Sequence, residues 1–255
     1  MALVISPKTT RGNVEAYVNM LGLQKVPRND CRFWHGNFRD FFFVGKDRRL
    51  SVLFTGYSGA VVGQAILQYD AQYREHDPKP GVYFVGSVYA FRDSDMEPGD
   101  LVLPVNTFSP DSFETAIYEN ARLCRVEDAT KPDEILKNRI LHIAEEEKIN
   151  LKSGNVYCCI SPGIYPQFHN GAELTDEGMW WNLSLSEIKP GGFNCGEYES
   201  AAALATSRLL GIPAVALLDV KDKRCSPTDY MLATSEQKEN ALKNMLTIVR
   251  RSVYE

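Results

Sequence analysis

The stretch CGEYESAAALATSRLLGIPAVALLDVKD, residues 195–222, decides the fold of this chain. Its small residues after Glu199 predict a closely packed helix, and the apolar run at 214–220 predicts a buried strand. Asp222 follows Glu199 after 23 positions, which is the length of one helix plus one strand. Because such a unit leaves one edge of a sheet and returns to it, we expect both acids on one side of the sheet.

Apolar runs alternate with amphipathic stretches along the rest of the chain, a pattern typical of a mixed or parallel sheet with covering helices. No linker, repeat or low-complexity segment divides the sequence, so we expect one α/β domain over residues 1–255, with a mixed central sheet flanked by helices. The pattern predicts strands at 2–6, 50–55, 82–85, 101–105, 155–160 and 214–220, and helices at 13–23, after 59 to about 73, and at 113–122, 133–148 and 236–253.

Bulk properties exclude several classes of function. A net charge of −5 without a basic run argues against a nucleic-acid partner. No apolar stretch approaches the roughly 18–20 residues that a membrane span needs, so we expect no membrane partner. The six cysteines show no C-x-x-C spacing and are interpreted as free buried thiols of a cytoplasmic protein. The four histidines lack metal-ligand spacing, and we predict no metal site.

Glycine and serine follow three of the predicted strands, at 56–59, at Gly86-Ser87 and at 161–163. Ligands of open α/β sheets lie outside the carboxyl ends of strands, where glycine lets the backbone approach them. One such pair is weak support because turns need glycine anyway. Three in order, followed by the two acids, indicate a ligand site at this edge.

Four segments carry a family resemblance: TGYSG at 55–59, VGS at 85–87, GDLV at 99–102, and EYESA at 197–201 with Asp222 one helix and strand later. In this order they resemble the nucleoside phosphorylase and nucleosidase superfamily of the purine nucleoside and uridine phosphorylase type. The resemblance covers most of the chain and is best over 50–105 and 193–222. It implies the α/β/α sandwich of that family.

The resemblance implies chemistry for the two acids. Breaking a ribosyl C–N bond builds positive charge on the sugar, and a carboxylate that accepts the 2′- and 3′-hydroxyls stabilises it. The resemblance gives that role to Glu199, and it gives protonation of the leaving purine to Asp222, a general acid. Glu197 belongs to the same substrate-binding motif, and Tyr198 replaces a methionine that packs against the ribose. Gly56, Gly86 and Ser87 complete the expected substrate-binding loops.

The nucleophile is the open part of this interpretation. Phosphorolytic members bind phosphate through an N-terminal segment, matched loosely here by Ser6 to Arg11, and through arginines, for which Arg11 and Arg39 are the candidates beside Ser87. Lys8 stands near the position of a glycine, and Phe84 replaces an arginine.

Phosphorolysis to a free base and ribose-1-phosphate is the favoured reaction, with inorganic phosphate as co-substrate and no cofactor. Hydrolysis by water and a non-catalytic nucleoside-binding member are the alternatives.

The base pocket is expected in the segment 161–169. Tyr165 or Phe168 is expected to stack on the base, a contact worth roughly 1–3 kcal/mol. Gln167 resembles the glutamine that uridine-cleaving members use for uracil, whereas Asp222 indicates a purine. Members of the family are dimers, trimers or hexamers with active sites near the interface, so the resemblance also implies a homo-oligomer.

Overall fold

The computed structural model describes residues 2–34, 36–56, 59–73, 81–91, 94–108, 130–158, 192–224 and 230–255. The predicted helix at 113–122 lies outside these ranges. The described helices are α1 (Arg11–Leu21), α2 (Gly36–Asp40), α3 (Gly59–Tyr73), α5 (Glu134–Glu146), α8 (Ser200–Leu209) and α9 (Ser235–Tyr254), with a 3-10 turn at Arg28–Asp30. The strands are β1 (Ala2–Ser6), β2 (Leu23–Lys25), β3 (Phe42–Gly45), β4 (Leu50–Phe54), β5 (Gly81–Ala90), β6 (Leu101–Phe108), β7 (Leu151–Cys158), β8 (Cys195–Glu197), β9 (Ala214–Arg224) and β10 (Tyr230–Leu232).

All described strands join one mixed sheet in the order β10-β9-β6-β7-β8-β5-β1-β4-β3-β2. An additional pairing between β5 and β9 joins two strands that this order separates. As a result β5, β9, β6, β7 and β8 form a closed ring, each bonded to the next, and β1 extends from β5 as an open sheet. The mixed α/β fold predicted from the sequence is confirmed.

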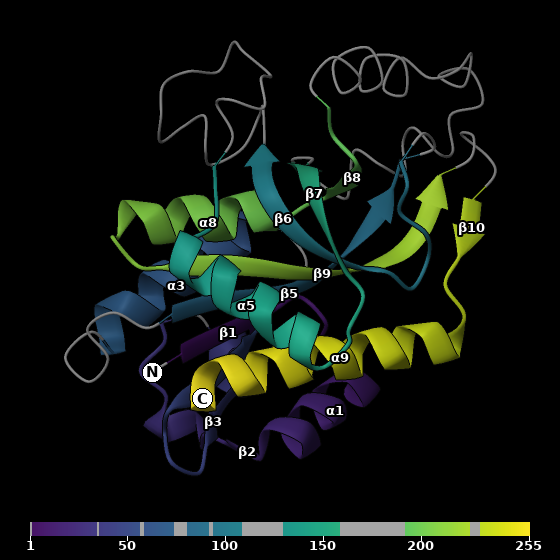
Figure 1. Cartoon of the computed structure of the whole chain (residues 1–255). Coiled ribbons are helices and arrows are strands. Elements are labelled where there is room, and N and C mark those ends of the chain that lie inside the picture. Colours follow the sequence, from purple (N-terminus) through teal and green to yellow (C-terminus); the bar gives the residue numbers. More distant parts are fainter. Residues whose placement is uncertain are drawn as a thin grey trace, which may run out of the picture.

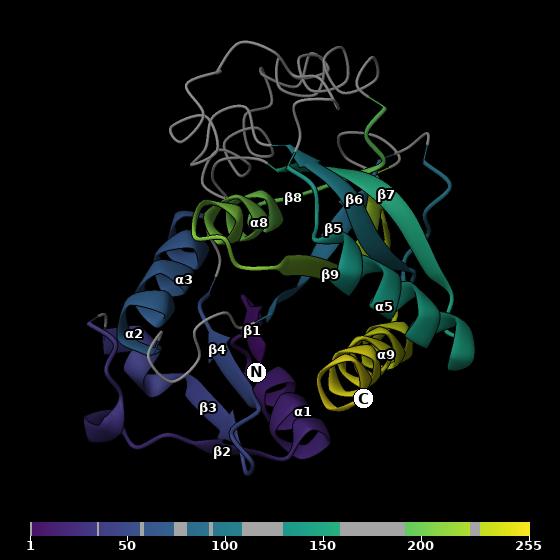
Figure 2. The same ribbon diagram turned by 60° about the vertical axis from the view of Figure 1, so that its left-hand side comes forward.

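Helices cover both faces of the sheet, as Figures 1 and 2 show. The face with α3 and α8 buries one hydrophobic cluster, which includes Phe84 and Val220. The face with α1, α5 and α9 buries a second cluster, which includes Tyr17 and Leu217. Adjacent residues of β5 and β9 alternate between the two clusters, because successive side chains of a strand point to opposite faces.

Local sequence explains where the covering helices begin. The carboxylate of Asp133 accepts the Leu136 amide at the start of α5. A capping box between Thr234 and Gln237 opens α9. Each arrangement satisfies backbone amides that have no partner within the helix.

Four predicted strands extend beyond the sequence pattern. β6 continues to Phe108 and β7 begins at Leu151, and β5 and β9 are longer at their carboxyl ends. The prediction that one strand ends at Gly86-Ser87 was wrong, because β5 continues to Ala90. Asp222 was placed just past a strand, but β9 continues through it to Arg224. Both extensions pair with neighbours that local patterning does not reveal, namely β8 for β5 and β10 for β9.

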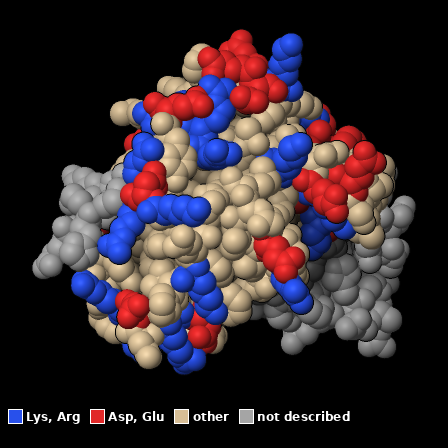
Figure 3. All heavy atoms as spheres, turned by 90° about the horizontal axis from the view of Figure 1, so that it is seen from below, with Lys and Arg blue, Asp and Glu red and all other residues tan. Residues whose placement is uncertain are grey.

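The surface that α1 and α9 help to form carries charges of both signs, with Lys and Arg beside Asp and Glu in Figure 3. Arg251 on α9, for example, contacts Glu146, Glu147 and Glu255. Within the described ranges, no helix combines the length and apolar character required to cross a membrane.

Candidate functional site

Tyr89, near the carboxyl end of β5, brings the two halves of the candidate site together. Its backbone pairs with Gly196 of β8 on one side and with Asp222 of β9 on the other. Neighbouring strands lie about 4.8 Å apart, so Gly196 and Asp222 are about 10 Å apart across Tyr89. This spacing matches the scale of a small ligand with two functional ends.

A β-bulge in β9 sets the direction of Asp222. Ser87 pairs with Asp219, but Tyr89 pairs with Asp222, so Lys221 is the extra residue of β9 and is exposed. Ser87 and Tyr89 share one face of β5, and Asp219 and Asp222 therefore share that face as well. A regular register would turn Asp222 to the opposite face. The bulge thus places the carboxylates of Asp219 and Asp222 on one face of β9.

Glu199 lies directly before α8, as its N-cap residue. The residue is 3% exposed, and Asp222 is 8% exposed. Burial of two acids at the ends of adjacent elements is unusual, because a carboxylate loses hydration when it leaves water. The positive end of the α8 dipole favours negative charge at Glu199.

The Glu199 side chain makes no capping hydrogen bond to α8. The Glu197 carboxylate accepts hydrogen bonds from the amides at the start of this helix instead. This carboxylate accepts the Glu199 amide at 2.6 Å, the Ser200 amide at 2.9 Å and the Ser200 hydroxyl at 2.8 Å. The Cys158 thiol of β7 donates to the same carboxylate at 2.5 Å. Glu197 therefore fixes the start of α8 to the sheet, and its expected contact with substrate remains a prediction.

We expect Glu197→Ala to lower the free energy of unfolding by about 2–3 kcal/mol, because buried amides at the start of α8 lose their acceptor. Glu197→Gln keeps one acceptor oxygen and should lose less. Denaturant unfolding measures both, with Glu145→Ala on the exposed side of α5 as the control, expected to change stability by less than about 0.5 kcal/mol. A neutral Glu197→Ala would contradict this capping role.

The beginnings of α3 and α8 meet at the same edge. A Cβ on Gly59 would lie 2.9 Å from the Tyr198 carbonyl oxygen and 3.2 Å from the Ala202 Cβ, so only glycine allows this approach. Gly56 precedes it with φ +74°, a left-handed conformation that favours glycine. The structure thus brings Gly56 and Tyr198, two predicted site residues, to adjoining helix starts.

Gly196 is similarly confined. A Cβ at this position would lie 2.4 Å from the Tyr89 ring, which is buried and in edge-to-face contact with Phe91. We expect Gly196→Ala to destabilise the protein by about 1–3 kcal/mol, because the ring must shift. Gly12→Ala is the matched control, since a Cβ added at Gly12 would meet no neighbouring atom within 4 Å. The thermal unfolding midpoint of this variant should not fall. Equal midpoints for the two variants would show that Tyr89 moves freely.

Ser87 belongs to a buried polar cluster that the sequence did not reveal. Its hydroxyl donates to Asp219 Oδ1 at 2.7 Å, and the Lys8 ammonium lies 2.5 Å from the same oxygen. The Tyr17 hydroxyl donates to Ser6 Oγ at 3.0 Å beside them. Burial, aided by the Asp219 charge, raises the pKa of Tyr17 well above its usual value although the Ser6 contact opposes it.

The sequence offers one signal for this cluster. Asp219 is an acid inside the apolar run 214–220, and a buried acid needs a partner. Lys8 was noted only as a replacement for glycine, so the pairing of these two residues was missed.

The two candidate phosphate arginines have separate partners. Arg11 is exposed on α1 and pairs with Glu15 at 2.7 Å. Arg39, in α2, donates through Nε to the Phe33 carbonyl. Phe84 is fully buried in the core. Within this chain the described contacts of Arg11 and Arg39 do not connect them to Ser87.

Other predictions concern side chains outside the described ranges. Tyr165, Gln167 and Phe168 lie there, so the expected base pocket remains a prediction. Cys31, Cys158 and Cys195 are buried thiols outside any disulfide. Burial and the Glu197 charge raise the pKa of Cys195, which keeps this thiol protonated.

Among the described residues, no group of three or more His, Cys, Asp and Glu side chains fits a metal ion.

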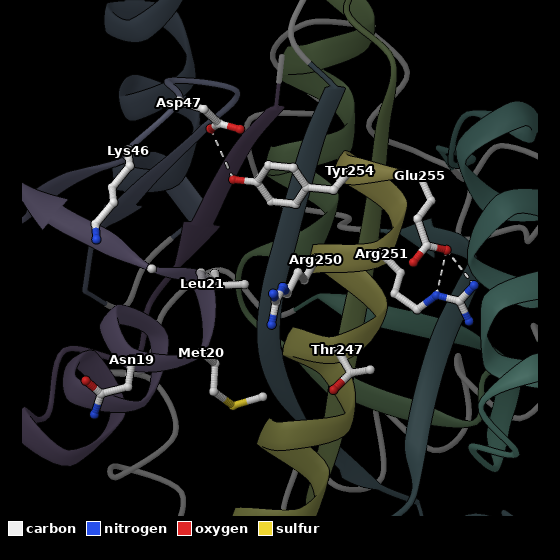
Figure 4. Close-up of a pocket in the computed structure, with 11 residues that line it drawn as sticks. Asn19, Met20, Leu21, Lys46, Asp47, Thr247, Arg250, Arg251, Tyr254 and Glu255 are labelled. Carbon is white, nitrogen blue, oxygen red and sulfur yellow. Dashed lines mark hydrogen bonds and ion pairs between the residues drawn. The ribbon is translucent and has the colours of Figure 1, made fainter.

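A groove of about 820 Å³ lies at the opposite edge of the sheet. Figure 4 shows Asn19, Lys46, Thr247 and Arg250 around it, at the ends of α1 and α9 and the turn after β3. This turn precedes β4, so the groove borders the amino ends of the parallel strands β1 and β4. The two acids occupy the carboxyl ends, and the groove is not part of their site.

Comparison with solved structures identifies similar folds. Purine nucleoside phosphorylase from Toxoplasma gondii in complex with immucillin-H aligns with a TM-score of 0.72 at 14% identity, over 99% of this chain and 89% of that one. The 5'-methylthioadenosine/S-adenosyl homocysteine nucleosidase of Campylobacter jejuni aligns with a TM-score of 0.68 at 18% identity, over 99% and 98% of the chains. A futalosine hydrolase mutant of Helicobacter pylori aligns with a TM-score of 0.66 at 14% sequence identity, over 99% of both chains.

Sequence comparison locates the chain in a family. No curated protein sequence gives a significant match. The profile of the phosphorylase superfamily matches residues 80–253, a segment that contains β5, Glu199 and Asp222. By this match over most of its length, the chain belongs to the phosphorylase superfamily.

Proposed function

We propose that this protein cleaves the N-glycosidic bond of a purine nucleoside, with Glu199 on the ribose and Asp222 on the leaving base. The observation that carries the proposal is the burial of both acids beside the two strands that pair with Tyr89. Membership of the phosphorylase superfamily supports cleavage of a glycosidic bond. The choice of a purine rests on Asp222.

Glu199 suits the sugar end of such a substrate. The bond to the base breaks through an oxocarbenium-like state, whose positive charge a nearby carboxylate stabilises. Hydrogen bonds from two ribose hydroxyls to that carboxylate are charge-assisted and hold the sugar in a fixed orientation. The buried position supports this role because water competes less for the carboxylate.

Asp222 suits the base end. A departing purine gains negative charge, and a proton delivered to its imidazole nitrogen N7 makes it a better leaving group. The bulge at Lys221 supports this role because it turns Asp222 to the face that Asp219 and Ser87 share. A carboxylic acid in this position donates the proton as the C–N bond breaks.

Two nucleophiles fit the chemistry. The sequence resemblance favours phosphate, which yields ribose-1-phosphate. The separate partners of Arg11 and Arg39 favour water, which yields free ribose, and hydrolysis is therefore the second candidate.

The test is a panel of purine and pyrimidine nucleosides incubated with the protein, with and without phosphate, and separated by chromatography. We expect free purine base to appear, together with either ribose or ribose-1-phosphate. Calorimetry on the same panel detects substrates that bind without turnover. If nucleosides bind but none of the panel is cleaved, the result would contradict catalysis and favour a nucleoside-binding protein.

A further inference from the structure

The ion pair between Lys8 and Asp219 is almost fully withdrawn from solvent. The Lys8 ammonium and Asp219 Oδ1 lie 2.5 Å apart, and the side chains are 10% and 5% exposed. Two charges taken out of water lose hydration that their mutual attraction repays only in part, so such a pair is a poor source of stability. Lys8 follows the carboxyl end of β1, and Asp219 lies three residues before Asp222 in β9, so we assign the pair a role in the site instead.

The Ser87 hydroxyl donates its hydrogen bond to the same carboxylate. A serine hydroxyl has one proton to donate, and that of Ser87 points to Asp219 Oδ1 at 2.7 Å. The positive charge of Lys8 is matched by Asp219 as well. This cluster of Lys8, Ser87 and Asp219 therefore offers an incoming anion neither a spare serine proton nor an unmatched ammonium.

The bulge adds a second negative group. Asp219 and Asp222 share one face of β9, as the register with Ser87 and Tyr89 requires. A phosphate dianion near that face would meet carboxylate oxygens, and like charges placed together repel. Water carries no net charge, so the carboxylates do not repel it.

We propose that the cluster of Lys8, Ser87 and Asp219 excludes anions and selects water as the nucleophile of this site. The inference rests on the proposed function, and it decides between the two reactions that function leaves open. Lys8 and Ser87 hold Asp219 through Oδ1, and among the described residues Oδ2 has no hydrogen-bonding partner. That oxygen is the acceptor for a proton from water.

The step balances without a cofactor. The water oxygen forms a bond to C1′ of the ribose while the bond from C1′ to the base nitrogen breaks. The electron pair leaves with the base, which takes a proton from Asp222, and one proton of the water passes to Asp219. The products are free base and ribose, and exchange with solvent returns both acids to their starting states.

Two measurements test the inference. Cleavage by the wild-type protein is followed with and without phosphate, and phosphate binding is measured directly by calorimetry. We expect wild-type turnover to change by less than about twofold with phosphate and to yield ribose, with no phosphate binding. Asp219→Asn leaves the Lys8 ammonium without its counter-charge, so this variant should lose hydrolysis and bind phosphate at least about tenfold more tightly than the wild type.

Two further variants make the result specific. In Lys8→Met/Asp219→Asn both charges are removed, and the gain in phosphate binding should disappear. Asp47→Asn removes an acid that pairs with Arg49 at the opposite edge of the sheet, and it should behave as the wild type does.

Wild-type turnover that requires phosphate and yields ribose-1-phosphate would overturn the inference while leaving the proposed cleavage intact. Tight phosphate binding by the wild type would overturn it too. If no nucleoside is cleaved, the proposed function fails, and the binding measurement still decides whether the cluster excludes anions. The wild-type experiments decide the matter alone if Asp219→Asn does not fold.

Discussion

Asp222→Asn is expected to lower turnover of a purine nucleoside by about 10²–10⁴-fold, the usual contribution of a general acid. Asparagine has nearly the same shape as aspartic acid but carries no proton that it can give to the leaving base. Substrate binding should change little, because the proton moves only as the bond breaks. The values of kcat and KM for one good purine nucleoside measure both effects.

A substrate with an activated leaving group separates this role from a structural one. Nitrophenyl riboside releases an anion that is stable near neutral pH and needs no protonation. We expect Asp222→Asn to cleave it at nearly the wild-type rate. Asp30→Asn, at an exposed acid of the 3-10 turn, should cleave both substrates normally. An equal loss on both substrates would show that Asp222 shapes the site without supplying a proton.

Most of the fold could be predicted from the sequence because its strands are long apolar runs. The strand at 2–6 agrees with β1 residue for residue, and the helices predicted at 133–148 and 236–253 differ from α5 and α9 by only one or two residues at each end. Short elements such as β2 and β10 were missed, since three residues carry too little pattern to be distinguished from a loop.

The candidate site was predictable only where local sequence determines it. Glu199 lies in a helix-start motif, so its place before α8 follows from neighbouring residues. The direction of Asp222 depends on a bulge that only the pairing of β9 with β5 defines. Lys8 and Asp219 are 211 positions apart, and no local pattern links them. Contacts of this kind arise from strand order, which the sequence does not show.

Glu199→Gln is expected to lower kcat/KM for a ribonucleoside by about 30- to 160-fold. The amide still accepts a hydrogen bond, but it lacks the charge that strengthens bonds from the two ribose hydroxyls and stabilises the positive sugar. Charge-assisted bonds exceed neutral ones by about 1–1.5 kcal/mol each, and two such losses give this factor. Glu145→Gln, on the exposed side of α5, should leave kcat/KM unchanged.

Deoxynucleosides identify the partner of Glu199. The wild-type protein should prefer a ribonucleoside to its 2′-deoxy counterpart, because the deoxy sugar leaves the carboxylate one hydrogen bond short. In Glu199→Gln that preference should shrink, since the bond that the hydroxyl makes is weaker. The ratio of the two kcat/KM values in each protein forms a cycle that cancels any general loss of activity. If the variant kept the full wild-type preference, Glu199 would not contact the 2′-hydroxyl, and its effect on rate would come from the charge it places beside the sugar.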